Sequence, residues 1–320
     1  MTNVLILGAN GFVGRRLVQV MASSQQFQPI ALVHRAGRPA APDVEVRVCD
    51  ATDQAALFAA ASGASYAVNC IAGDAQTMIA ATNNLVALAL QQKLQGIIHL
   101  SSMSVYGHAT GLVDERQPLD PSGGWYGSAK VKCETLLQDA GTPAVILRPG
   151  CIYGPGSEQW TARIGRLLDA GRIGDLGPAG DGHCNLSYID DVVNAILAAL
   201  ATPAAIGQGL NVSDPEPVTW NRYFFRFGQE IGAVPIRRIS RRRLQIEGKL
   251  LAPALKIAEI AAARLHMPNL LPEPIPPSLI WTWSHDIVLD NRRADAVLRL
   301  PRTDLAHGIR AAAAWFRSLG

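Results

Sequence analysis

Short apolar strands alternate with longer helical segments through the first 150 residues, and this alternation constrains the fold more than any other feature of the chain. Strand-like runs of aliphatic and β-branched residues occupy 4–7, 30–33, 44–48, 67–71, 97–100 and 144–147. Helical patterns lie between them at 12–21, 54–61, 78–91 and 126–138. Nearly continuous apolar strands joined through helices are typical of a parallel sheet that is covered on both faces. We therefore predict an α/β fold with a doubly wound parallel (Rossmann) sheet.

The pattern changes near residue 150, where Gly and Pro become dense and mark loops. Further helical patterns follow at 190–200, 218–231 and 245–265, and one more strand is predicted at 210–212. We predict a first domain over 1–150 that is completed by about 184–213. Residues 151–320 are expected to form mainly a smaller, interleaved C-terminal domain.

Composition narrows the class of protein. Of the 320 residues, 48% are apolar and 17% are charged, which suits a large folded core and excludes a disordered chain. The net charge of +3 is too small for a nucleic-acid-binding protein. The five scattered cysteines predict reduced thiols and a cytosolic location, and the histidines show no metal-ligand spacing. No signal peptide or span of roughly 18 apolar residues is found, so no membrane partner is expected.

A glycine-rich turn connects the first predicted strand to the first helix. It reads Gly8-Ala9-Asn10-Gly11-Phe12-Val13-Gly14. Glycines at such positions allow a tight turn, a close approach of the backbone to a pyrophosphate, and close packing of helix on strand. The helix N-terminus adds free N–H groups and the positive end of its dipole. An ordinary Gly-rich turn is the alternative, and the strand–turn–helix setting favours a dinucleotide site.

The residues about 20 positions further on bear on the choice of dinucleotide. An NAD-preferring site usually has an acidic residue there, whereas this chain has His34 and Arg35, with Arg38 close behind. A guanidinium suits a 2′-phosphate, so NADP is the preferred cofactor and NAD the alternative. Arg35 could instead lie over the adenine or in solvent. Asp50, after the third strand, could accept from the adenine amino group or cap the following helix.

Two side chains with acid–base potential lie one turn apart on the helix predicted at 126–138. The i,i+4 spacing places the Tyr126 phenol and the Lys130 ammonium on one face of that helix. A phenol has a pKa of about 10, and a nearby cation lowers that pKa toward working pH. Ser102 follows the fifth strand, at the strand end where a doubly wound sheet binds its ligands.

These features belong to a longer series of motifs. The series is Gly8…Gly11…Gly14, Asp50-Ala51-Thr52-Asp53, Ser101-Ser102…Val105-Tyr106-Gly107, Asp114-Glu115, Tyr126…Lys130 with Glu134, Leu147-Arg148-Pro149, Tyr153-Gly154-Pro155-Gly156, Tyr188-Ile189-Asp190-Asp191-Val192 and Asn211-Val212. Over about residues 3 to 215 the chain therefore resembles the extended short-chain dehydrogenase/reductases, also called NAD-dependent epimerase/dehydratases.

The resemblance implies a role for each matching residue. Ser102 would be the catalytic hydroxyl, Tyr126 the general acid and base, and Lys130 the residue that lowers the phenol pKa and holds the nicotinamide ribose. The first domain would bind NAD(P) and the second a small-molecule substrate, and a homodimer would form through the helices at 78–91 and 126–138. The implied cofactor contacts are Gly8, Asn10, Gly11, Phe12, Val13, Gly14, His34, Arg35, Asp50, Ala51, Ala72, Tyr126, Lys130 and Pro149.

Two departures from the family pattern bear on the substrate. Met78 stands where relatives often have an Asn, which makes a proton relay there doubtful. The segment 184–188 lacks the Arg-Asp-Phe of sugar-nucleotide enzymes, although Arg163, Arg166 or Arg172 could bind a phosphate instead. The main hypothesis is hydride transfer on a nucleotide sugar. The alternatives are an NADPH-dependent ketone reductase of the hydroxysteroid or dihydroflavonol type, and a non-enzymatic dinucleotide sensor.

Two segments of the C-terminal half remain outside these motifs. The basic run 237–243 is interpreted as a solvated face rather than a phosphate or partner patch. Residues 249–265 are interpreted as an amphipathic helix that closes the substrate pocket, with attachment to a membrane surface as the second possibility.

Overall fold

A computed structural model of the chain describes residues 1–37, 40–264 and 272–319, and it separates into two compact units. The first unit combines Met1–Gly150, Ser187–Ser213 and Leu289–Thr303. The second unit combines Cys151–Leu186, Asp214–Val288 and Asp304–Gly320. Each unit is therefore assembled from stretches that are far apart in the sequence.

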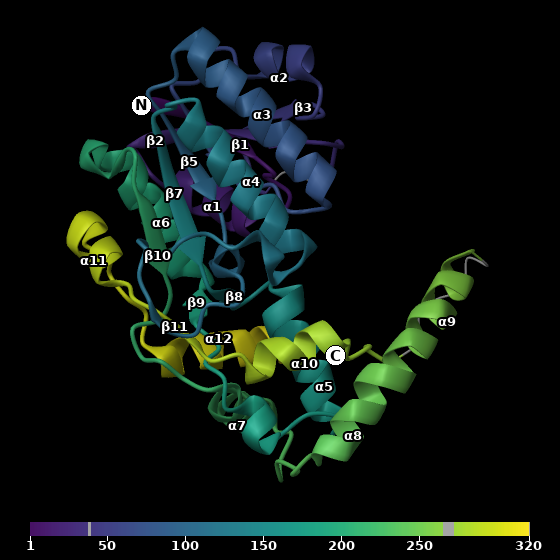
Figure 1. Ribbon diagram of the computed structural model, residues 1–320. Coiled ribbons are helices and arrows are strands. Elements are labelled where there is room, and N and C mark those ends of the chain that lie inside the picture. The colour runs from purple at the N-terminus through teal and green to yellow at the C-terminus, as the bar shows by residue number, and fades with distance from the viewer. Residues whose placement is uncertain (38–39, 265–271, 320) are drawn as a thin grey trace. The chain divides into compact units, whose positions relative to one another are not determined.

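The first unit is built on a seven-stranded parallel sheet (Figure 1). Its strand order is β10-β7-β5-β4-β1-β2-β3. The strands are β1 Thr2–Leu7, β2 Phe27–Val33, β3 Glu45–Val48, β4 Tyr66–Asn69, β5 Gly96–Leu100, β7 Ala144–Pro149 and β10 Gly209–Val212. The order reverses between β1 and β4, and a doubly wound sheet binds ligands outside the carboxyl ends of its strands at such a reversal. The predicted fold class is confirmed.

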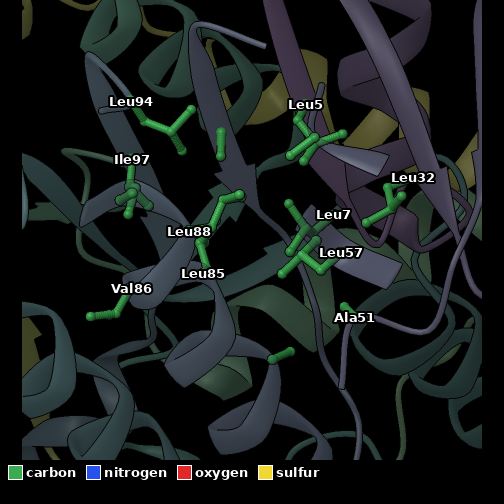
Figure 2. Packing of buried hydrophobic residues seen from close by; sticks show 14 of the residues in the cluster. Leu5, Leu7, Leu32, Ala51, Leu57, Leu85, Val86, Leu88, Leu94 and Ile97 are labelled. Carbon is green, nitrogen blue, oxygen red and sulfur yellow. The ribbon is translucent and has the colours of Figure 1, made fainter. Parts of the chain in front are cut away.

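Helices cover both faces of this sheet. They are α1 Phe12–Ala22, α2 Gln54–Ala60, α3 Ala75–Gln92, α4 Trp125–Asp139, α6 Ile189–Ala201 and α11 Arg292–Leu298, and a short strand β6 spans Gly111–Val113. Figure 2 shows Leu5 and Leu7 of β1 packed against Leu57 of α2 and Leu85 of α3. Alternate residues of a strand point to opposite faces, so Val4 and Ile6, also buried, serve the other layer.

Most elements begin and end within three residues of the predicted positions. The fourth strand ends at Asn69, two residues before the predicted residue 71. The Asn69 side-chain oxygen accepts a hydrogen bond from the backbone N–H of Ile71 at 3.1 Å. This local bond turns the chain away from the sheet, as Asn side chains often do at turns.

The second unit has an aromatic core. Phe227 stacks on Tyr223 with ring centroids 5.6 Å apart, and Trp283 meets Phe224 edge-on at 5.5 Å. The remaining helices are α5 Arg163–Asp169, α7 Trp220–Ile231, α8 Arg241–Ile246, α9 Ala252–Arg264, α10 Pro277–Ser284 and α12 Leu305–Arg317. The remaining strands are β8 Cys151–Tyr153, β9 Leu186–Tyr188 and β11 Ile287–Leu289.

The helix predicted at 245–265 begins four residues earlier, at Arg241. Ser240 precedes it and accepts a hydrogen bond from the N–H of Arg243 at 3.2 Å, which is an N-cap that fixes the start. A π-helical turn at Glu247–Leu251 joins α8 to α9. Leu265, the predicted last residue, lies outside the described residues.

All five cysteine thiols are free and buried, in agreement with the predicted reduced thiols. Within the described ranges, no helix combines the length and the apolarity that crossing a bilayer would require.

Candidate active site

The glycine-rich turn has the geometry that its sequence predicts. Gly8 has a φ of +77°, and a Cβ placed on it would lie 3.1 Å from the carbonyl carbon of Cys70. A Cβ on Gly14 would lie only 2.3 Å from the carbonyl oxygen of Gly8, so α1 packs directly on the turn. Side chains at either position would displace backbone, which explains why both are glycine.

The start of α1 fits a phosphate group. Gly11 is the N-cap and supplies no side-chain bond, and the first turn of the helix has no acidic residue. The hydrogen-bond ladder of α1 begins with the N–H of Arg15, which donates to the carbonyl oxygen of Gly11 at 2.8 Å. The N–H groups of Phe12 and Val13 therefore precede the helical ladder, as in an anion-binding helix terminus. Asn10 and Gly11 are exposed beside them.

The segments after β2 and β3 meet near this turn. His34 and Arg35 follow β2 directly and are exposed, and a Cβ on Gly37 would lie 3.9 Å from the side-chain nitrogen of Asn10. The His34 ring lies 3.8 Å from a carboxylate oxygen of Asp50. The loop that starts at Arg35 thus borders the glycine turn, whereas Arg38 lies outside the described residues.

Asp50 does not cap the following helix, which corrects one of the two expectations for it. The cap of α2 is Asp53, which accepts from the N–H of Ala56 at 3.0 Å. Asp50 instead accepts from the backbone and the hydroxyl of Thr52, and these bonds lower the pKa of its carboxyl group. The carboxylate that remains accessible stays ionised at neutral pH.

Asn84 is a site residue that sequence reasoning missed. Its side-chain nitrogen donates to the carbonyl oxygens of Ala51 at 3.1 Å and Thr52 at 2.9 Å. These bonds anchor the loop after β3 to α3. The available signal was an Asn among Leu and Val on the buried side of a helix, where a polar group needs a partner.

The Tyr126 phenol meets Ser102 at the carboxyl end of β5. Tyr126 lies in the first turn of α4, and Ser102 is the N-cap of a short 3-10 helix, Met103–Tyr106, that follows the strand. Burial raises the pKa of Tyr126, and the hydrogen bond with the Ser102 side chain lowers it in part. Hydrogen bonding to the charged form of an acid stabilises that form, so Ser102 favours the phenolate.

Lys130 is buried and bonded to backbone, not to an acid. Its ammonium donates to the carbonyl oxygen of Leu100 at 2.8 Å and to that of Ile71 at 3.4 Å. Its side chain is only 3% exposed, and burial lowers its pKa. The nitrogen lies 5.8 Å from the centre of the Tyr126 ring. In this structure burial raises the pKa of Tyr126 and the Ser102 hydrogen bond lowers it, so the role of Lys130 in lowering the phenol pKa stays a prediction.

Residues 70–72 connect the glycine turn to Tyr126 and Lys130. Gly8 approaches Cys70 and Ile71, and the carbonyl of Ile71 accepts from Lys130. Ala72 follows and is exposed, at the carboxyl end of β4. Predicted residues from four segments are therefore brought to one edge of the sheet. Pro149 lies buried at the end of β7, where it pairs in register with Val212.

Met78 occupies the position where relatives often have an Asn, and its surroundings are apolar. Met78 is 1% exposed and packs with Ala129 and Cys133 in a small cluster that Tyr126 also contacts. A thioether and methyl groups cannot pass a proton, so the doubt about a relay at this position is supported by the packing.

A buried ion pair lies one turn beyond Lys130. Arg148 of β7 donates to Glu134 of α4 at 2.7 Å, and the Ser101 hydroxyl donates to the same carboxylate at 2.5 Å. Arg148 also donates to the Tyr106 hydroxyl at 3.0 Å, and Tyr106 donates to Asn211 at 2.7 Å. These residues fix α4 against β5, β7 and β10.

The three arginines considered as phosphate ligands are all engaged with carboxylates of the second unit. Arg163 and Arg166 both pair with Glu273, and Arg172 pairs with Glu247. Binding a phosphate would require breaking these pairs. Across the described ranges, no cluster of three His, Cys, Asp or Glu side chains could hold a metal ion.

Comparison with known proteins supports the family that the motifs suggest. The model of the NAD dependent epimerase/dehydratase family matches residues 4–213. A 3-diazoavenalumate denitrifying reductase of a Streptomyces species is 29% identical over 74% of this chain and 84% of its own length. An N-acetyl-alpha-D-glucosaminyl-diphospho-ditrans,octacis-undecaprenol 4-epimerase of Escherichia coli O157:H7 is 25% identical over 69% of this chain and 70% of its own.

The fold also matches solved structures. UDP-glucuronic acid 4-epimerase from Bacillus cereus, in complex with UDP-glucuronic acid and NAD, superposes with a TM-score of 0.73. The match covers 100% of both chains at 20% sequence identity.

We predict that Ser102→Ala raises the pKa of Tyr126 further, because it removes the hydrogen bond that favours the phenolate. The shift should be about one pH unit, which corresponds to the strength of one hydrogen bond to a charged group. Ultraviolet titration of phenolate absorbance, taken as the difference from Tyr126→Phe, measures it. Ser104→Ala is the matched control, because the Ser104 hydroxyl is buried in the same turn without a hydrogen-bond partner among the described residues. Equal shifts in both variants would contradict the assignment.

Proposed function

This chain belongs to the NAD dependent epimerase/dehydratase family, and we propose that it interconverts a secondary alcohol and a ketone on a nucleotide-sugar substrate. Members of the family are NAD-dependent enzymes, so the expectation of an enzyme is confirmed. Hydride transfer is the reaction type that we propose, with the first unit as the cofactor domain and the second as the substrate domain. A homodimer through α3 and α4 remains part of the proposal.

The observation that carries the proposal is the convergence of Ser102, Tyr126 and Lys130 at the carboxyl ends of β4 and β5. Two backbone carbonyls hold Lys130 there, and Ser102 bonds to the phenol. The same strand ends border Gly8 through Cys70 and Ile71. A dinucleotide seated on the glycine turn would extend across this edge of the sheet.

Residues of this chain transfer the hydroxyl proton of the substrate. A nicotinamide supplies the hydride acceptor and donor when it is bound. In the oxidation direction the phenolate oxygen of Tyr126 takes the hydroxyl proton of the alcohol, and in the reduction direction the phenol returns it. Ser102 is placed to hydrogen-bond the same substrate oxygen, and it favours the phenolate between the two steps. Lys130 joins the end of β5 to the segment that follows β4, through the carbonyls of Leu100 and Ile71.

The identity of the substrate rests on the relatives. The Escherichia coli relative is named as a 4-epimerase of a sugar that is linked through a diphosphate, and the Bacillus cereus structure contains UDP-glucuronic acid. Both proteins act on, or hold, a sugar diphosphate. We extend this substrate class to the present chain.

A ketone reductase is the second candidate function, and two observations favour it. Met78 makes the Asn position apolar, and the arginines 163, 166 and 172 are all engaged by carboxylates. The Streptomyces relative is also named as a reductase. The NADPH-dependent hydroxysteroid or dihydroflavonol type is the form of reductase that we consider.

For the cofactor we propose a preference for NADP within this NAD-dependent family. Arg35 is exposed immediately after β2, next to the loop that borders Asn10. No acidic residue occupies positions 34–37. Asp50, with one carboxylate oxygen 3.8 Å from His34, is available for the adenine amino group.

We predict that Tyr126→Phe lowers turnover at least a hundredfold while the dissociation constant for the cofactor changes less than threefold. The phenol transfers the proton, and general acid–base groups typically contribute about 10²–10⁴-fold to the rate. The assay supplies UDP-glucose or UDP-N-acetylglucosamine and separates the C4 epimers by chromatography. It also follows net NADPH consumption with an aryl or steroid ketone.

Tyr66→Phe is the control, since Tyr66 begins β4 at the opposite end from the site. Epimer formation without net change in the nicotinamide supports the sugar hypothesis, and NADPH consumption with a ketone supports the reductase instead. Undiminished turnover by Tyr126→Phe would refute the acid–base assignment.

We predict that Arg35→Ala weakens NADPH binding by about ten- to a hundredfold and leaves NADH binding unchanged, because only the 2′-phosphate uses the guanidinium. Fluorescence titration measures both affinities. Arg293→Ala is the control, because Arg293 is exposed and bonds to Gln208. A wild-type protein that binds NADH more tightly than NADPH would overturn the preference.

A further inference from the structure

Exposed apolar side chains concentrate on the helical stretch formed by α8, the π-helical turn and α9. Figure 1 shows the ribbon of this stretch in green. Ile257 is 70% exposed and Leu250 is 67% exposed. Ile246 and Leu251, on the same stretch, are also exposed. Large apolar side chains that are exposed singly are common, whereas four within twelve residues of one helical stretch form a patch.

The opposite side of this stretch packs against the rest of the second unit, to which the stretch belongs. Leu244, Gly248 and Ala252 are buried at intervals of four residues. A Cβ on Gly248 would lie 2.8 Å from the Cδ1 of Ile280, so the helix is packed closely there. Glu247 is buried and forms an ion pair with Arg172. One side of the stretch is therefore fixed, and the other is presented to solvent.

The exposed residues follow helical spacing. Ile246, Leu250, Pro253 and Ile257 are separated by four, three and four residues, which is the interval at which helix residues share a face. Beside this face, Pro253 and Leu255 line a groove of about 570 Å³ whose other wall includes Pro272 and Pro274. The apolar surface thus extends beyond the helix.

Positive charge gathers on the same segment. Residues 237–257 contain five arginines and two lysines but only one acidic residue, Glu247, which is committed to Arg172. The whole chain has a net charge of only +3, so acidic residues outnumber basic ones outside this segment. Arg241, Arg242 and Lys249 are exposed, next to the apolar residues.

We propose that this stretch, residues 241–257, binds the surface of an anionic lipid bilayer. An amphipathic helix with an apolar face and flanking cations lies in the plane of a membrane interface, with the apolar side chains among the lipid chains and the cations at the headgroups. A second copy of the chain is a poorer occupant, because it would bring two strongly positive segments together. This proposal does not depend on the proposed reaction.

The proposal changes the order of the two interpretations that the sequence allowed. An amphipathic helix that closes a pocket would bury its apolar face, whereas Leu250 and Ile257 are about two-thirds exposed. Membrane-surface attachment, the second possibility, accounts for both the exposure and the charge. It also uses the basic run 237–243, whose arginines are exposed, although Arg238 pairs with Asp175.

Co-sedimentation of the full chain with vesicles tests the proposal. Vesicles of phosphatidylcholine with an equal amount of phosphatidylglycerol should bind the protein, and vesicles of phosphatidylcholine alone should bind it at least tenfold more weakly. The double variant Leu250→Glu/Ile257→Glu should lose binding at least tenfold, because two carboxylates replace the inserted side chains. Arg242→Glu should lose about fivefold or more, since each cation near an anionic surface contributes that much.

Matched controls lie elsewhere on the chain. Leu112→Glu changes an apolar residue of the same 67% exposure, and Arg310→Glu changes an exposed arginine of α12. Both controls should bind vesicles like the wild type. Loss of binding in the controls equal to that in the test variants would overturn the proposal. No binding by the wild type, or a dimer in sedimentation equilibrium that Leu250→Glu dissociates without any vesicle binding, would overturn it as well.

Discussion

The buried ion pair between Glu134 and Arg148 is the interaction on which the rest of the site depends. It joins α4 to β7 with side chains that are 0% and 4% exposed. Burying two charges is costly, and the cost is offset only when each remaining oxygen and N–H finds a partner. Ser101 and Tyr106 supply those partners, so the register of α4 against the strand ends is set by a satisfied network.

The positions of Tyr126, Lys130 and Ser102 follow from this register. One turn before Glu134, Lys130 reaches the carbonyls of Leu100 and Ile71, and one turn earlier still, Tyr126 reaches Ser102. The three positions share a helix face because they are spaced at intervals of four. Met78 and Cys133 pack in the cluster that Tyr126 contacts, and burial raises the pKa of the phenol.

The sequence was informative wherever short-range rules apply. Strand and helix positions, the glycine turn, and the face shared by Tyr126 and Lys130 follow from periodicity and sterics, so they could be predicted. Partners of buried polar groups could not, because they depend on which strands become neighbours. The acceptors of Lys130 are backbone carbonyls of β5 and of the segment after β4, and Asn84 reaches a loop more than 30 residues away. The carboxylates that engage Arg163 and Arg172 are likewise distant in sequence.

The free energy of unfolding of Glu134→Gln, measured in denaturant, tests most directly whether this ion pair holds the site together. We expect a loss of about 3–5 kcal/mol, because Arg148 would remain charged and buried beside a neutral amide. Glu45→Gln, which removes an exposed carboxylate from its pair with the partly buried Arg47, should cost no more than about 1 kcal/mol. Equal, small losses in the two variants would contradict the role of the buried pair.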